Sequence, residues 1–248
     1  MPILELTNVT KTYNDFSVVK DFNFSVNEGE LRCLLGPNGA GKTTTIDLIT
    51  GRQKLTSGKI IFDGKNISRL LERQIVNMGV GRKFQVPAVF KELTVKENFE
   101  VAFTGNKRGP FQNMNPFRKA NLTSRYHEII ELVSLKDRLD TVAGYLSHGE
   151  TQWLEIGMVL MLNPKLLLMD EPTAGMTEQE TEKTSELFNS LKGEHTLVVV
   201  EHDMSFVRSI ADIISVMDQG SMLAEGTIAE IENHQKVKEV YLGSEGIK

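Results

Sequence analysis

The chain has 248 residues, enough for one large domain or two small ones, and 40% of them are hydrophobic, so it can bury a sizeable core. A net charge of −5 argues against nucleic acid or anionic lipid as the main partner, and no stretch approaches the roughly 20 apolar residues of a membrane span. We expect no signal peptide at the start of the chain, and the single cysteine, Cys33, excludes an internal disulfide and fits a reducing cytosol.

The first thirty residues alternate apolar and polar positions, which predicts strands. Tyr13 lies in a loop of this segment, where it could stack on an adenine or belong to the core. Residues 30–35 (ELRCLL) then form a short apolar run that is typical of a buried strand, and Cys33 within it is expected to be a small core residue.

Residues 36–43 read GPNGAGKT and match the phosphate-binding loop G-x-x-x-x-G-K-[ST]. Its glycines let backbone N–H groups face phosphate oxygens, and the helix predicted directly after it points a positive end at the same oxygens. Lys42 is expected to reach the β- and γ-phosphates, and the Thr43 hydroxyl to help hold Mg²⁺. The nucleotide-contacting residues predicted here are Gly36, Pro37, Asn38, Gly39, Ala40, Gly41, Lys42, Thr43 and Thr44.

The next elements are a strand at 59–63, a short helix at 70–76 and a strand that Gln85 ends. A neutral amide at a strand end could ligate Mg²⁺ or sense a γ-phosphate, although most glutamines are simply exposed. Thr94 and Glu97 form a capping box that opens a helix through residue 103, and residues 104–121 are predicted to be a long surface loop. We interpret residues 86–163 as a mostly helical segment inserted into an α/β core.

Residues 146–150 read LSHGE and precede a helical stripe that begins at Trp153. Ser147 is a good N-cap, and Glu150 completes a capping box. The segment is either only a helix start or a second anion-binding helix N-terminus. The second interpretation requires that the segment face phosphates bound by another copy, because it has no obvious route to the phosphate loop of its own chain.

Two apolar strands, at 166–169 and 196–200, flank a predicted crossover helix at 178–191. Asp170 and Glu171 follow the first strand, where one carboxylate can bind Mg²⁺ through water and the next can polarise an attacking water. His202 follows the second strand, and its imidazole could hydrogen-bond a γ-phosphate oxygen, although a lone histidine is more often structural.

Taken together, these motifs and their order resemble the ATP-binding subunit of an ATP-binding-cassette transporter over nearly the whole chain, treated as one domain, 1–248, with the helical subdomain at 86–163. The resemblance implies an α/β fold: a P-loop NTPase core with a mostly parallel sheet, an N-terminal antiparallel β part and an inserted helical subdomain. It implies that two head-to-tail subunits sandwich two ATP molecules with Mg²⁺, each ATP contacting one subunit's phosphate loop and the other's signature segment, 146–150.

The same resemblance gives the site residues their roles. Glu171 is expected to be the general base, His202 the switch histidine, and Gln85 part of the loop that couples nucleotide state to the membrane subunits. Asp170, Thr43 and Gln85 are expected to hold the metal. The signature residues Ser147, His148, Gly149 and Glu150 are expected to contact the partner's nucleotide. The family usually has LSGGQ there, and Leu-Asp where this chain has Met176-Thr177.

Residues 81–103 and 237–243 are similar to importers of branched-chain amino acids and urea, and residues 146–160 to the urea-type branch. We therefore predict an importer ATPase for a small polar solute, with urea as the first choice and branched-chain amino acids as the alternative. A soluble ATP switch that takes no part in transport is the competing hypothesis from another class of function. The expected partners are a second cassette, two membrane-spanning permease subunits and, indirectly, a solute-binding protein, with no nucleic acid. This places the chain at the cytoplasmic face of the cell membrane.

Overall fold

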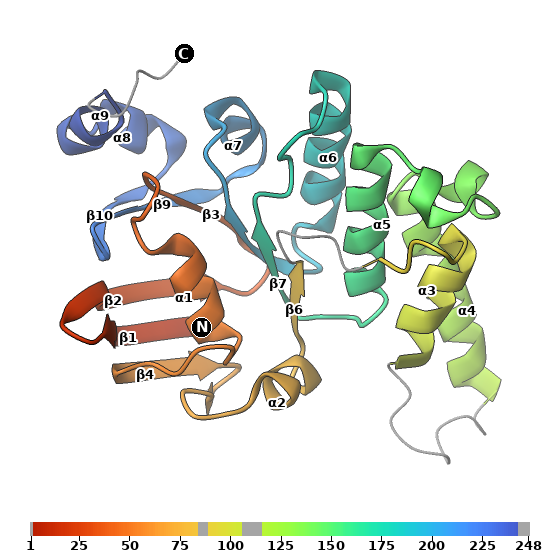
Figure 1. The fold of residues 1–248 in the computed structure, drawn as a ribbon, viewed down its shortest axis with the longest axis horizontal. Helices are drawn as coiled ribbons and strands as arrows, with labels where there is room; N and C mark the ends of the chain where they lie inside the picture. The colour runs from red at the N-terminus through yellow and green to blue at the C-terminus, as the bar shows by residue number, and fades with distance from the viewer. Residues whose placement is uncertain (1, 84–88, 106–115, 243–248) are drawn as a thin grey trace.

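The computed structural model describes residues 2–83, 89–105 and 116–242. Its N-terminal part is an antiparallel sheet of order β2-β1-β4-β5, which lies beside the larger sheet (Figure 1). The strands of this sheet are β1 (Pro2–Tyr13), β2 (Phe16–Asn27), β4 (Ser57–Phe62) and β5 (Lys65–Asn66). The alternation of apolar and polar residues in the first thirty positions therefore predicted β1 and β2 correctly, and the strand predicted at 59–63 corresponds to β4.

The larger sheet has six strands in the order β10-β9-β3-β8-β7-β6. Its strands are β3 (Leu31–Leu35), β6 (Val80–Lys83), β7 (Leu166–Asp170), β8 (Thr196–Val200), β9 (Ile213–Asp218) and β10 (Ser221–Gly226). All neighbours from β9 to β6 pair in parallel, and only β10 runs antiparallel to β9. Every residue of β3, β7 and β8 is buried, as expected for parallel strands covered on both faces.

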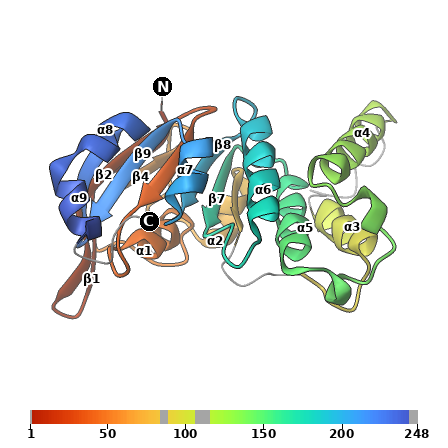
Figure 2. The same cartoon turned by 90° about the horizontal axis from the view of Figure 1, so that it is seen from above.

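Helices cover both faces of this sheet and extend from one side of it (Figures 1 and 2). They are α1 (Lys42–Ile49), α2 (Glu72–Asn77), α3 (Val95–Gly105), α4 (Pro116–Leu132), α5 (His148–Leu160), α6 (Glu178–Leu191), α7 (Met204–Ile210), α8 (Ile228–Asn233) and α9 (Gln235–Leu242). Helix α1 packs between the two sheets in one apolar cluster, and α5, α6 and α7 pack on the opposite face in the other. Cys33 is fully buried there, as predicted.

The α/β fold expected from the sequence is confirmed, with one local correction. The predicted loop at 104–121 is wrong at both ends, because α3 continues to Gly105 and α4 begins at Pro116. Proline is compatible with the first position of a helix, where its missing N–H has no intrahelical partner, so it marks a helix start here rather than a loop. Helices α3, α4 and α5 lie between β6 and β7 in the chain and form a group on one side of the molecule (Figure 1). The boundaries 86–163 for this group stay a prediction.

Candidate functional site

The phosphate loop connects β3 to α1 at the carboxyl edge of the parallel sheet. Gly36 has a φ of 152°, and a Cβ there would lie 2.3 Å from the carbonyl oxygen of Met217, so this close approach requires glycine. The loop is closed by the Ala40 N–H, which donates to the Pro37 carbonyl at 3.1 Å. The Lys42 Nζ then donates to the Gly36 carbonyl at 2.7 Å and to the Pro37 carbonyl at 3.2 Å. The lysine therefore lies folded over its own loop.

Two carboxylates lie within electrostatic reach of this lysine. Lys42 is buried, and burial lowers the pKa of its ammonium, while the charges of Glu171 and Asp170 act in the opposite direction. The three residues come from the starts or ends of different elements, α1 and β7, which the parallel sheet brings to the same edge. The structure thus brings Lys42 close to Asp170 and Glu171, which lie more than a hundred positions further along the sequence.

Asp170 ends β7 with a side chain that is almost fully buried. It accepts a hydrogen bond from the Thr43 side chain, and the Arg82 Nη2 atom lies 3.8 Å from its Oδ2. Burial raises the pKa of the Asp170 carboxyl, Arg82 lowers it, and Glu171 raises it again. Oδ2 is buried and has no hydrogen-bond partner within the part of the chain that the structure describes. A buried carboxylate oxygen without a donor, next to a threonine hydroxyl, fits a hard cation.

The protein alone offers few ligands for such a cation. In the described ranges, no group of three or more His, Cys, Asp and Glu side chains could hold a metal ion. A magnesium ion bound by Thr43 and Asp170 would therefore complete its oxygen shell with phosphate oxygens and water, as magnesium does in nucleotide sites. Gln85, the third predicted metal ligand, lies outside the described residues.

Glu171 and His202 lie next to each other just beyond the sheet. The His202 Nδ1 atom is 3.8 Å from the Glu171 Oε1, and the Glu171 N–H donates to the Val200 carbonyl at the end of β8. Glu171 has a left-handed φ of 47°, which is uncommon for a residue with a side chain and often accompanies a functional site. The Glu171 side chain is 28% exposed and that of His202 66% exposed, so both can meet a ligand from solvent.

Sequence reasoning missed Glu201, a buried carboxylate that connects two segments at this edge of the sheet. One oxygen accepts hydrogen bonds from the Thr173 N–H at 3.1 Å and the Thr173 hydroxyl at 2.6 Å, and the other accepts from the His202 N–H at 3.0 Å. Glu201 thereby joins the turn after Glu171 to the residue that carries the imidazole. A carboxylate directly after the all-apolar strand β8 was the available signal, but only the fold shows that Thr173 is its partner.

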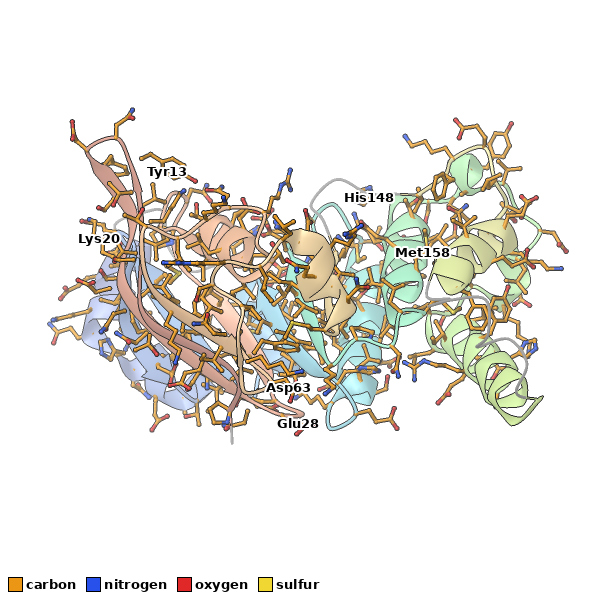
Figure 3. All side chains as sticks on the ribbon, turned by 90° about the horizontal axis from the view of Figure 1, so that it is seen from below. Tyr13, Lys20, Glu28, Asp63, His148 and Met158 are labelled. Atoms are coloured by element: carbon orange, nitrogen blue, oxygen red, sulfur yellow. The ribbon has the colours of Figure 1, made fainter. Side chains whose placement is uncertain are left out.

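We expect Glu201→Ala to destabilise the protein by about 3 kcal/mol, because it leaves buried N–H and hydroxyl donors unpaired. Urea unfolding followed by circular dichroism measures the change in the free energy of unfolding. Glu28→Ala is the matched control, since Glu28 is an exposed carboxylate in the loop between β2 and β3 (Figure 3). A loss below 1 kcal/mol for Glu201→Ala would contradict the role that we give to this carboxylate.

Tyr13 is the last residue of β1 and not part of a loop as predicted. It is 43% exposed, so the alternative of a core residue is also wrong. Its hydroxyl donates to the Gln53 side-chain oxygen, and the Lys11 Nζ atom lies 4.6 Å from the centre of its ring. An exposed ring beside the loop that follows α1 remains available to a planar ligand. Stacking on adenine stays a prediction.

The signature segment lies apart from the phosphate loop. Ser147 and Glu150 form the predicted capping box at the start of α5, and Glu150 also pairs with Arg138. Strand β7 and helix α6 separate α5 from α1 in both views (Figures 1 and 2), and Tyr13 and His148 are well apart (Figure 3). A ligand in the phosphate loop therefore does not meet Ser147 of the same chain. Glu180, whose carboxylate accepts from the Ser147 hydroxyl at 3.2 Å, is a second residue that sequence reasoning missed.

Comparisons with known proteins agree with this geometry. A family model described as ABC transporter matches residues 19–174. The high-affinity branched-chain amino acid transport ATP-binding protein BraF of Pseudomonas aeruginosa is 37% identical to this chain, with 98% of each chain covered. The LivG protein of Salmonella typhimurium, with the same description, is 36% identical over 98% of each chain.

Solved structures agree as well. An ATP-binding cassette of an ABC transporter in its ADP conformation has a TM-score of 0.86 and 32% identity, covering 98% of this chain and 99% of its own. A dimeric cassette in a post-hydrolysis state, bound to ADP and Pi, has a TM-score of 0.77 and 28% identity, covering 91% of this chain and 98% of its own.

Proposed function

Since this chain belongs to the ABC transporter family and is an importer ATPase, we propose that it drives the uptake of branched-chain amino acids across a membrane through permease partners. One observation carries the proposal. Lys42 is bonded to its own phosphate loop, and Asp170, which accepts a hydrogen bond from Thr43 at the end of that loop, lies with Glu171 at the same edge of the parallel sheet. Positive charge, a cation ligand and a candidate base are the groups that phosphoryl transfer to water requires.

In this proposal the phosphate loop and Lys42 hold the β- and γ-phosphates, and Glu171 orients and deprotonates the attacking water. His202, within 3.8 Å of Glu171, hydrogen-bonds a γ-phosphate oxygen and helps to fix that water. Thr43 and Asp170 hold Mg²⁺, which neutralises charge on the phosphates when it is bound. Tyr13 stacks on the adenine, and Gln85 joins the metal shell or senses the γ-phosphate.

The active form is a head-to-tail dimer with two nucleotides at the interface. The distance between α5 and the phosphate loop in one chain supports it, because Ser147, His148, Gly149 and Glu150 then meet the nucleotide of the other chain. ATP closes the dimer since it contacts both faces, and loss of the γ-phosphate reopens it. The existence of a dimeric cassette of similar fold bound to ADP and Pi supports a dimer as the active form.

The identity of the transported solute is the most detailed part of the proposal. The sequence alone favoured urea on the basis of the signature segment, but the relatives above are branched-chain amino acid transport proteins, which favours the alternative. Among the described residues no helix is long and apolar enough to cross a membrane. Because the relatives are described as transport ATP-binding proteins, the proposal includes two membrane-spanning permeases, a second cassette and a solute-binding protein, and it places the chain at the cytoplasmic face of the membrane.

The test is to purify the tagged protein from its native membranes in mild detergent and to identify the co-purifying chains by mass spectrometry. We expect permeases, a cassette and a solute-binding protein. The binding protein is then titrated separately with leucine and with urea, and hydrolysis by the reconstituted complex is measured with each. Stimulation by leucine supports the proposal, and stimulation by urea alone moves the substrate to the urea branch. Recovery of the chain without permeases from several detergents would favour a soluble ATP switch.

A further inference from the structure

His148, the first residue of α5, contacts the turn that follows Glu171. Its Nε2 atom lies 2.8 Å from the carbonyl oxygen of Ala174. A carbonyl only accepts, so Nε2 carries the proton in this contact. The buried amide of Gln152 lies 3.3 Å from the same nitrogen, and turning that amide over brings its unpaired oxygen to the Nε2–H. Both contacts are made at Nε2, whose single hydrogen points mainly to the nearer Ala174 carbonyl and is shared with the amide oxygen.

The turn that His148 contacts is the one that carries Glu171. The Ala174 N–H donates to the Glu171 carbonyl at 3.3 Å, and the Met176 N–H donates to the Thr173 carbonyl at 3.0 Å. Thr173 is in turn held by the buried Glu201. A short run of hydrogen bonds thus leads from the start of α5 to the backbone of the candidate base.

A second set of hydrogen bonds joins the start of α5 to the start of α6. Glu180 accepts from the Ser147 hydroxyl with one oxygen, and from the Thr177 N–H and hydroxyl with the other. Those bonds lower the pKa of the Glu180 carboxyl, so it stays ionised between the two helix starts. A Cβ on Gly175 would lie 3.2 Å from the His148 Nε2, so the imidazole packs closely against the turn.

We propose that His148 is a positioning residue: through its bond to Ala174 it fixes the position of Glu171 relative to the N-terminus of α5. The inference rests on the proposed function, in which that N-terminus faces the partner's nucleotide. Movement of α5 on contact with the partner's phosphate then shifts Ala174, and with it the carboxylate that serves the subunit's own nucleotide. These contacts therefore connect the signature segment, which faces the partner's nucleotide, with Glu171, which serves the nucleotide of its own subunit. A glycine at position 148 has no side chain with which to make this link.

The test compares three variants in the assembled transporter. His148→Ala removes the donor, and His148→Gln places an amide N–H at a reach similar to that of Nε2. His127→Ala is the control, because His127 is an exposed histidine on α4. We expect His148→Ala to lower kcat for ATP hydrolysis by roughly tenfold to a hundredfold, since the base is then misplaced. The KM for ATP should be nearly unchanged, because the imidazole is bonded to Ala174 and position 148 meets the partner's nucleotide through its backbone, which alanine keeps. We expect His148→Gln to recover most of that loss and the control to match the wild type.

Thermal unfolding of each variant shows whether the protein is folded at the assay temperature. A folded His148→Ala protein with wild-type kcat overturns the inference, as does a change confined to KM. Failure of His148→Gln to recover activity also overturns it, because the donor is then not the property that matters. If the wild-type assembly itself hydrolyses no ATP, that result contradicts the proposed function and, with it, this inference. An active assembly in which all variants match the wild type overturns the inference alone.

Discussion

Lys42→Ala is expected to weaken the binding of MgATP at least a hundredfold, which corresponds to about 2.8 kcal/mol. Lys42 is 9% exposed, and its ammonium donates to the carbonyls of its own loop within electrostatic reach of Asp170 and Glu171. A phosphate entering the loop replaces those carbonyls as its partner, and charge-assisted bonds to phosphate are among the stronger hydrogen bonds. Alanine offers neither charge nor donor, so the γ-phosphate faces Asp170 and Glu171 without compensation.

Isothermal titration calorimetry with MgATP measures the change, and Lys20→Ala serves as the control. Lys20 lies on the exposed side of β2 and carries the same charge, so its removal alters the net charge equally (Figure 3). The thermal unfolding temperature without nucleotide separates weak binding from loss of fold. An unchanged affinity for ATP in a folded Lys42→Ala protein would contradict the assignment of residues 36–43 as the phosphate loop.

Elements with a local signal could be predicted from the sequence. The crossover helix at 178–191 was predicted between two apolar strands at the bounds that α6 has, and the structure shows that Thr177 and Glu180 cap its start. The apolar runs that became β7 and β8 end in Asp170 and Glu201, and the parallel sheet places those ends on one edge. Because both strand ends lie on that edge, Asp170 and Glu171 could be expected to lie near His202.

Contacts between elements could not be predicted in this way. The bonds of Glu201 with Thr173 and of His148 with Ala174 join residues that no local pattern pairs. They depend on how far β8 and α5 extend relative to the turn after β7, which packing decides. The substrate could be predicted only by resemblance, which favoured urea, because in the proposed transporter the cassette does not touch the solute and no residue of it is shaped by the solute's chemistry. The start of α4 was missed because proline can begin a helix or break one.

Glu171→Gln is expected to reduce ATP hydrolysis by roughly 10²–10⁴-fold while the protein still binds MgATP. Glutamine has the same shape and keeps an oxygen that can orient water, but it cannot accept the proton of that water. Its backbone keeps the 47° φ and the hydrogen bond to the Val200 carbonyl, so the turn remains in place. Because the γ-phosphate then persists, the contacts that close the dimer persist too, and the variant should accumulate as an ATP-held pair.

Light scattering at saturating MgATP measures that pair as a mass of twice the 27.8 kDa chain. Glu178→Gln is the matched control, because it removes an exposed carboxylate in the first turn of α6, away from the phosphate loop, and should hydrolyse ATP at the wild-type rate. With ADP in place of ATP the Glu171→Gln variant should return to monomer, since no γ-phosphate joins the two faces. A Glu171→Gln protein that binds MgATP and stays monomeric would contradict the head-to-tail sandwich, and one that hydrolyses ATP at the wild-type rate would contradict Glu171 as the base. Because the pair accumulates only while the γ-phosphate persists, the mass tests the interface in a variant whose hydrolysis is lost, and the rate of hydrolysis tests the chemistry.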